Sequence, residues 1–109
     1  MNKRQRRFDR LQRMGCVACL SENIHSQPDI HHIVSNGYRR LSGGDESTIP
    51  LCPWHHRGVP PDDMTLADAE SHYGPSLALS KRDFVSRYGR ENDLLLLVNY
   101  LIDKTSKLH

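Results

Sequence analysis

Cysteine and histidine residues occur at two pairs of positions with the spacing of a structural zinc site. The pairs are Cys16-x-x-Cys19 and Cys52-x-x-His55. Structural zinc takes four tetrahedral ligands, thiolates and imidazoles, and a tight turn or a helical first turn aims both members of such a pair the same way. We therefore predict that these four residues bind one structural zinc ion. The alternative is that the cysteines are simply buried in the core.

His56 is a second candidate for the same zinc site. On a helix Cys52 and His56 are four residues apart and could also share one ion. His55 and His56 lie roughly 100° apart around a helix axis and cannot easily serve the same ion. The repeated x-x spacing favours His55 as the zinc ligand, and the alternative that His56 takes this role stays open. In either case one of the two histidines is left for other chemistry.

Another histidine pair, His31-His32, lies in a segment rich in β-branched residues. Neighbouring side chains on a strand point to opposite faces, so one imidazole could hold a metal while the other reaches a substrate. Imidazole is a common metal ligand and titrates near neutral pH. The alternative is one buried and one exposed histidine without chemistry, but His56 on the following segment favours the chemical interpretation.

The N-terminal segment is strongly basic. Residues 1–13 hold six lysines and arginines against one acidic residue, whereas the whole chain has a net charge of only +2. A basic arm of this kind is typical of contact with nucleic-acid phosphates, although a solvated helix face has the same composition. The predicted DNA-binding residues, here and in a later arginine pair, are Lys3, Arg4, Arg6, Arg7, Arg39 and Arg40.

Length and cysteine content limit the class of protein. The 109 residues fit a single domain spanning 1–109, whose thin core would benefit from a bound metal. Three cysteines argue against a framework built only from disulfides. No apolar run approaches the roughly 20 residues of a membrane span, and no apolar segment typical of a secretion signal follows the basic start. We expect a cytoplasmic protein without a membrane partner.

Turn signals and hydrophobic spacing predict the elements that must position these residues. Apolar residues at helical spacing favour a basic helix near the N-terminus, and a proline in the second strand favours an edge position. The expected elements are a helix over 2–13, strands over 30–34 and 48–51, a short helix from Cys52 or Pro53 to Arg57, and helices over 65–73, 80–88 and 91–104. The fold class is α+β: a small zinc-stapled core over 15–58, a basic helix or arm over 1–14 and a helical part over 63–105.

Two segments resemble the HNH endonucleases, also called ββα-metal or His-Me finger enzymes. They are residues 29–33 (Asp-Ile-His-His-Ile) and residues 49–56 (Ile-Pro-Leu-Cys-Pro-Trp-His-His), separated by a glycine-containing loop. In that family a β-hairpin and a helix hold one divalent metal ion. A closer resemblance, to phage recombination-enhancement nucleases of the Ref type, extends over most of the chain. It adds residues 73–78 (Tyr-Gly-Pro-Ser-Leu-Ala) and Phe84-x-x-x-Tyr88-Gly89.

The resemblance implies a role for each histidine. His31 and His56 would bind a catalytic Mg²⁺ or Mn²⁺ ion, and His32 would be the general base. The Cys/His zinc site would be a treble-clef-like element beside the active site. The central family position is usually Asn or His, and here the candidates are Asp45, Glu46 and Ser47. We favour Asp45, which could orient His32 or add a carboxylate to the metal.

The predicted activity is metal-dependent hydrolysis of DNA phosphodiester bonds, with His32 taking a proton from the attacking water. The Ref-type resemblance implies a RecA-type recombinase filament as a partner and a role in phage DNA recombination. The alternative is a non-catalytic zinc module that binds nucleic acid or assists a recombinase. The unusual central residue is the best support for this alternative.

Overall fold

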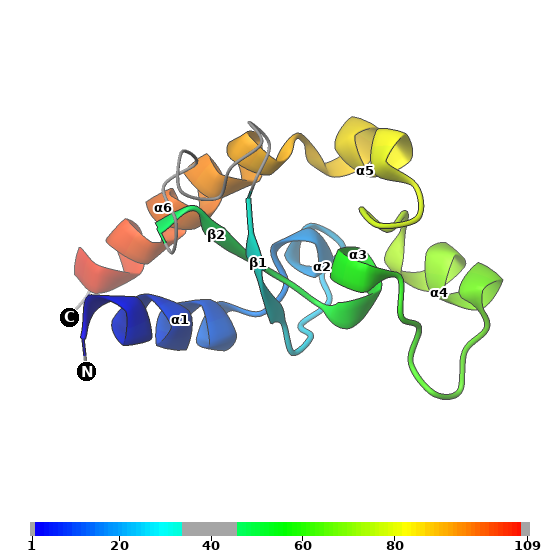
Figure 1. The fold of residues 1–109 in the computed structure, drawn as a ribbon, viewed down its shortest axis with the longest axis horizontal. Helices are drawn as coiled ribbons and strands as arrows, with labels where there is room; N and C mark the ends of the chain where they lie inside the picture. The colour runs from blue at the N-terminus through cyan, green and yellow to red at the C-terminus, as the bar shows by residue number, and fades with distance from the viewer. Residues whose placement is uncertain (1, 34–45, 108–109) are drawn as a thin grey trace.

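A computed structural model of the protein describes residues 2–33 and 46–107. Within these residues the fold is α+β, as predicted, with a two-stranded sheet among helices (Figure 1). The elements are α1 (Lys3–Met14), α2 (Val17–Ser21), β1 (Asp29–His32), β2 (Thr48–Leu51), α3 (Pro53–Arg57), α4 (Leu66–Tyr73), α5 (Lys81–Tyr88) and α6 (Glu91–Lys107).

The sheet pairs β1 with β2 in antiparallel register. Asp29 lies opposite Leu51, and His32 lies opposite Thr48. The first strand therefore begins and ends earlier than the predicted 30–34. Pro50 lacks a backbone N–H, and it is tolerated here because each strand of a two-stranded sheet has an unpaired edge. The predicted Asp45, Arg39 and Arg40 lie outside the described residues.

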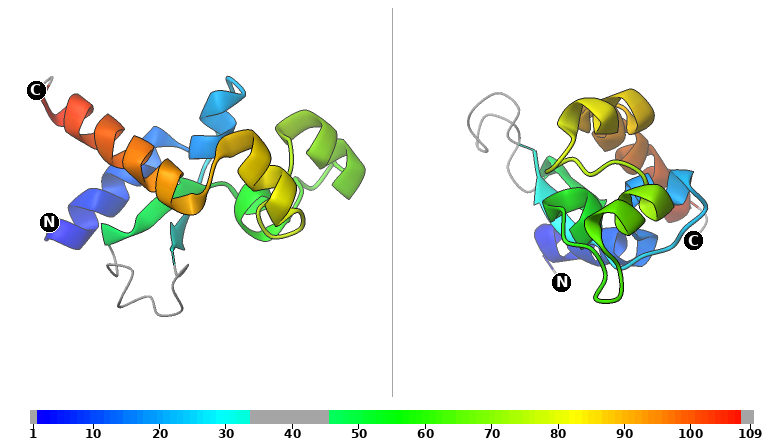
Figure 2. Two further views of the ribbon diagram at one scale, coloured as in Figure 1. Left: turned by 90° about the horizontal axis from the view of Figure 1, so that it is seen from above. Right: turned by 90° about the vertical axis from the view of Figure 1, so that its right-hand side faces the viewer.

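Helices α1 and α6 both pack against the sheet. Leu11 of α1, Ile49 of β2 and Val98 of α6 are fully buried in one core. Burial of each such side chain contributes about 1.5–3 kcal/mol relative to exposure. The N-terminal end of α1 and the C-terminal end of α6 lie at one end of the molecule, and α4 and α5 lie at the other (Figures 1 and 2). The chemistry-bearing strands and α3 lie between these two ends.

Local sequence signals account for most helix ends. Asn2 forms a capping box with Gln5 at the start of α1, and Thr65 forms one with Asp68 at the start of α4. The expected elements did not include α2, a short helix over Val17–Ser21 that begins directly after the N-cap Cys16. No helix in the described residues is long and apolar enough to cross a membrane.

Candidate metal centre and histidine pair

Four ligand-forming side chains converge where the N-terminal ends of α2 and α3 meet. They are Cys16, Cys19, Cys52 and His55, all buried, with ligand atoms within 4.8 Å of one another. His55 Nδ1 lies 3.4 Å from Cys52 Sγ, and Cys52 Sγ lies 3.8 Å from Cys19 Sγ. A tetrahedron with Zn–S bonds of about 2.3 Å and a Zn–N bond of about 2.0–2.1 Å has edges of about 3.5–3.8 Å. The group could therefore hold a metal such as zinc, and in the described part of the chain no other three such side chains bring their ligand atoms this close together.

Two helix starts bring these ligands together. Cys16 is the N-cap of α2, and its Sγ accepts the backbone N–H of Cys19 at 3.4 Å. Cys52 is the N-cap of α3, and its Sγ accepts the backbone N–H of His55 at 3.5 Å. Pro53 follows at the first helical position, where its missing N–H costs nothing. The repeated x-x spacing therefore reflects two capped helical turns that face each other.

Electrostatic coupling within the cluster favours cation binding. Hydrogen bonds with Cys16 and Cys19 hold the pKa of the Cys52 thiol well below its usual range. Burial opposes charging of the His55 ring, but hydrogen bonds with Cys16 and Cys52 raise its pKa to about 9. These shifts favour the charged forms of the Cys52 thiol and the His55 ring, and a bound metal cation would displace the remaining protons.

The carbonyl of Tyr73 determines which nitrogen of His55 faces the sulfur atoms. His55 Nε2 lies 2.9 Å from this oxygen, so an N–H at Nε2 donates to it and leaves Nδ1 for a metal. The Tyr88 hydroxyl lies 2.7 Å from the same oxygen, and the Tyr88 ring packs edge-on against the His55 ring. Sequence reasoning assigned no chemistry to either tyrosine, because a backbone acceptor and a distant ring contact leave no local pattern.

Gly74 allows this arrangement. Its φ is +90°, in the left-handed region that favours glycine, and a Cβ here would collide with the Tyr88 hydroxyl. Trp54 Nε1 donates to the Gly74 carbonyl at 2.9 Å, and the Leu77 N–H donates to the His55 carbonyl at 2.9 Å. The segment after α4 therefore holds α3, and with it the candidate ligand His55, in position.

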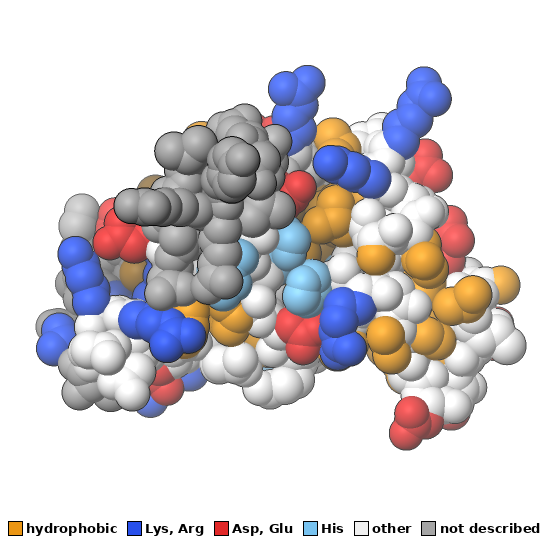
Figure 3. Space-filling model, viewed as in Figure 1, with side chains coloured by type: hydrophobic (Ala, Val, Ile, Leu, Met, Phe, Trp, Pro, Cys, Tyr) orange, Lys and Arg blue, Asp and Glu red, His pale blue; other side chains and the backbone are white. Residues whose placement is uncertain are grey.

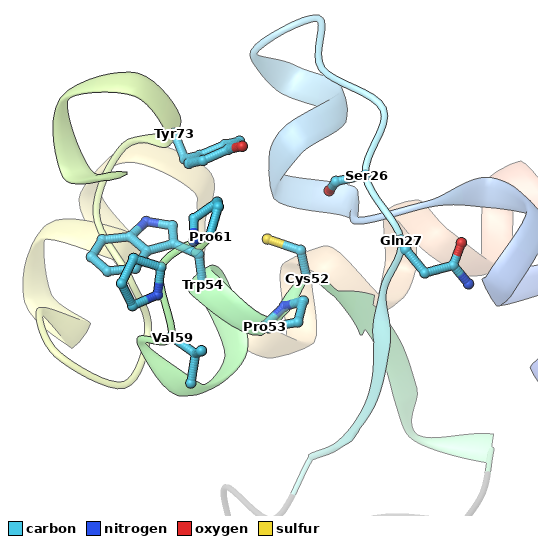
Figure 4. A pocket seen from close by; sticks show the side chains of 9 residues that line it. Ser26, Gln27, Cys52, Pro53, Trp54, Val59, Pro61 and Tyr73 are labelled. Atoms are coloured by element: carbon cyan, nitrogen blue, oxygen red, sulfur yellow. The ribbon is translucent and has the colours of Figure 1, made fainter. Parts of the chain in front are cut away.

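A pocket of about 240 Å³ opens beside the cluster (Figure 4). Cys52 points toward Pro61 and Tyr73 across it, and Ser26 lies opposite on the segment between α2 and β1. Cys52 is 5% exposed, whereas Cys16, Cys19 and His55 are 0% exposed. The Ser26 hydroxyl is buried without a hydrogen-bond partner in the described residues. Hydrogen bonds with Cys16 and Cys52 raise the pKa of the nearby Cys19 thiol, and Ser26 partly opposes this rise. It is therefore available to donate to a thiolate.

His31 and His56 form a second site on the other side of α3. Their ring centroids lie 4.9 Å apart in an edge-on arrangement. His31 Nε2 lies 2.7 Å from Glu91 Oε2, and His56 Nδ1 lies 3.0 Å from Asp29 Oδ2. Figure 3 shows histidine side chains on an accessible face, with acidic and basic groups around them. The structure thus brings the two predicted catalytic metal ligands together and adds a carboxylate to each.

Both carboxylates favour their charged form. The hydrogen bond from His31 lowers the pKa of Glu91, despite partial burial. Burial opposes charge on Asp29, but hydrogen bonds from Arg57 and His56 lower its pKa. Asp29 was part of the predicted motif without a role, and Glu91 was missed because it follows His31 by 60 residues.

His32 lies away from this pair, as alternation along a strand predicts. Its ring is 6.2 Å from the Phe8 ring of α1, in a T-shaped contact. The predicted general base therefore lies on the side of β1 that faces the basic helix. His32 also has other interactions within the protein.

The predicted DNA-binding residues of α1 differ in their placement. Arg7 is half-buried: it donates to the Thr48 side chain at 2.8 Å, to the Thr48 carbonyl at 2.7 Å and to Asn99 at 2.9 Å. It ties α1 to β2 and α6. Lys3 lies on the surface, 3.6 Å from Glu46, and the Arg4 guanidinium lies 5.1 Å above the Phe8 ring. Arg6 also interacts within the protein.

These features define a small α+β protein with a buried Cys₃His group and a neighbouring pair of carboxylate-bound histidines. A family model described as "Recombination enhancement, RecA-dependent nuclease" matches residues 2–103. The chain therefore belongs to this family of RecA-dependent nucleases, which confirms the Ref-type resemblance. No curated protein and no solved structure matches the chain significantly.

Proposed function

We propose that the protein is a metal-dependent DNA endonuclease of the HNH type that acts with RecA in recombination. One observation carries this proposal: His31 of β1 and His56 of α3 lie side by side, with ring centroids 4.9 Å apart, in a chain of the RecA-dependent nuclease family. The order strand, strand, helix around this pair matches the order in which HNH enzymes present their catalytic residues. The HNH assignment and the role of each histidine are part of the proposal.

The donor set at the second site suits a divalent cation. His31 and His56 would hold Mg²⁺ or Mn²⁺, ions that keep several waters and need few protein ligands. When bound, such an ion supplies charge stabilisation at the phosphate oxygens. His32 would take the proton from the attacking water. Asp45 is proposed to orient His32 or to add a carboxylate.

The Cys₃His group is proposed to bind zinc in a structural role. Two of its ligands come before the sheet in the sequence, at the N-cap of α2 and within that helix. The other two come after the sheet, at the N-cap of α3 and within that helix. A closed set of four protein ligands leaves no open position for substrate. Zinc here would hold the two helix starts together while the histidine pair carries out the chemistry.

The DNA backbone is proposed to lie along a basic hollow next to Glu91. This hollow of about 340 Å³, at the junction of α5 and α6, is lined by Lys81 and Arg90 among others. Arg57 lies on the other side of the histidine pair, 2.8 Å from Asp29. Lysine and arginine side chains surround the histidines on the face shown in Figure 3. Phosphates held there would lie beside the proposed metal ligands.

Replacing both Lys81 and Arg90 with glutamine is expected to weaken DNA binding in a salt-dependent way. Loss of two phosphate contacts should reduce the slope of log affinity against log salt by about 1.8 on duplex DNA. Fluorescence anisotropy without divalent metal, over a series of salt concentrations, measures this slope. Lys104→Gln removes one charge about 20 Å farther along α6 and should have little effect. An unchanged slope in the double variant would show that the DNA does not contact Lys81 and Arg90.

The function is tested by plasmid nicking and by cleavage of RecA-coated single-stranded DNA. We expect cleavage that requires Mg²⁺ or Mn²⁺ and increases when RecA and single-stranded DNA are present. The competing possibility, a non-catalytic zinc module, is supported by the absence of Asn or His at the central position. It predicts one tightly bound zinc ion, no second metal site and no cleavage with any of these additions.

A further inference from the structure

Glu91 contacts the histidine pair from the start of α6, a helix to which the sequence pattern assigns no chemistry. We propose that Glu91 is a positioning residue: it accepts an N–H from His31 Nε2 and so leaves Nδ1 of that ring for a divalent ion. This inference rests on the proposed function, because the ion belongs to the nuclease chemistry. It brings the start of α6 into the active site.

The contact is short and sheltered. Glu91 Oε2 lies 2.7 Å from His31 Nε2, and the two side chains are only 14% and 16% exposed. An exposed ion pair holds its geometry weakly, because solvent competes and both side chains remain mobile. Shelter from solvent strengthens a charge-assisted hydrogen bond, so this one can fix the ring orientation.

Asp29 does the corresponding work on the second ring. It engages His56 at Nδ1, whereas Glu91 engages His31 at Nε2. Among the described residues, each ring therefore keeps one nitrogen without a carboxylate: Nδ1 on His31 and Nε2 on His56. A carboxylate on the far nitrogen is the common way to fix the tautomer of a metal-binding histidine. The two pairs together present one fixed ring nitrogen from β1 and one from α3.

Core packing fixes the position of Glu91. It is the first residue of α6, and the same helix buries Leu94 and Val98 in the core against the sheet. The helix packs on β2, the strand that pairs with His31-bearing β1, and so it fixes the position of the Glu91 carboxylate. The pairing needs no loop closure, so it exists before DNA or metal arrives.

The test compares Glu91→Ala and Glu91→Gln in the zinc-loaded protein. Circular dichroism and zinc content establish that each variant is folded. Mn²⁺ affinity, measured by electron paramagnetic resonance, should fall by about 10–100-fold in Glu91→Ala. Glu91→Gln keeps an acceptor oxygen and should retain most of the affinity. Asp103→Asn removes an exposed carboxylate from the same helix and should change nothing.

A second readout is independent of metal. In the metal-free second site, ¹⁵N NMR should find the His31 proton on Nε2 in the wild type and a mixture of tautomers in Glu91→Ala. Equal losses of Mn²⁺ affinity in the alanine and glutamine variants would overturn positioning and indicate direct coordination or a charge effect. An unchanged tautomer in Glu91→Ala would also overturn it. If the wild type binds no Mn²⁺ while the tautomer responds as expected, the proposed function fails and the positioning contact stands.

Discussion

Replacing His55 with alanine is expected to remove zinc and unfold the protein, whereas the same change at the adjacent His56 should leave both zinc and fold intact. His55 is fully buried, and its Nδ1 lies 3.4 Å from Cys16 Sγ and 3.5 Å from Cys19 Sγ. His56 is partly exposed and bonds instead to Asp29. The two neighbouring histidines therefore form a matched pair of substitutions with opposite expected results.

The size of the effect follows from how much of the fold depends on the metal. Structural zinc binds small domains with an apparent free energy of about 10–16 kcal/mol. The whole stability of a typical domain is about 5–15 kcal/mol, so loss of the ion is enough to unfold it. The His55 ring also packs against Phe84 and Tyr88, and its removal leaves a cavity. In His56→Ala, Asp29 keeps Arg57 as a partner.

Zinc content of the purified variants and thermal unfolding followed by circular dichroism measure both results. The wild type treated with a strong chelator should unfold as His55→Ala does. Zinc retained by His55→Ala and lost from His56→Ala would show that the two histidines have exchanged roles. Zinc and fold retained by both variants would mean that the Cys₃His group is an ordinary buried cluster.

The sequence predicted the features that depend on local geometry. Cys16 and Cys52 each begin a helical turn whose third residue supplies the next member of the Cys₃His group, and such a repeat is visible in the chain. The helix ends at Gly15 and Gly89 are marked by glycine in the same way. Alternation along β1 correctly separated His31 from His32. Each of these inferences needed only a few neighbouring residues.

Features that depend on distant contacts could not be predicted. Glu91 meets His31 only because α6 returns across the sheet, and the Tyr73 carbonyl meets His55 only because α4 ends there. Arg7 was predicted to contact DNA, and distant contacts give it a different role. It belongs to the basic pattern of α1, but its guanidinium is directed inward to Thr48 and Asn99. Charge pattern alone does not distinguish an arginine that faces DNA from one that joins two elements.

The histidine pair and His32 should separate metal binding from proton transfer. We expect His32→Ala to cleave DNA about 10²–10⁴-fold more slowly, because a positioned general base contributes this much. Its Mn²⁺ affinity, zinc content and DNA binding should stay close to those of the wild type. His31→Ala should also lose cleavage, but through loss of the second metal ion.

The two variants are compared under single-turnover conditions with RecA and single-stranded DNA present. Mn²⁺ is first held at a concentration that saturates the wild type and is then raised above it. High Mn²⁺ should restore part of the activity of His31→Ala, because mass action can fill a weakened site. It should not restore His32→Ala, which lacks the proton acceptor rather than the ion. Wild-type cleavage by His32→Ala would remove His32 from the reaction. Rescue of His32→Ala by Mn²⁺ would instead make His32 a metal ligand, and the base would then have to be sought elsewhere around the pair.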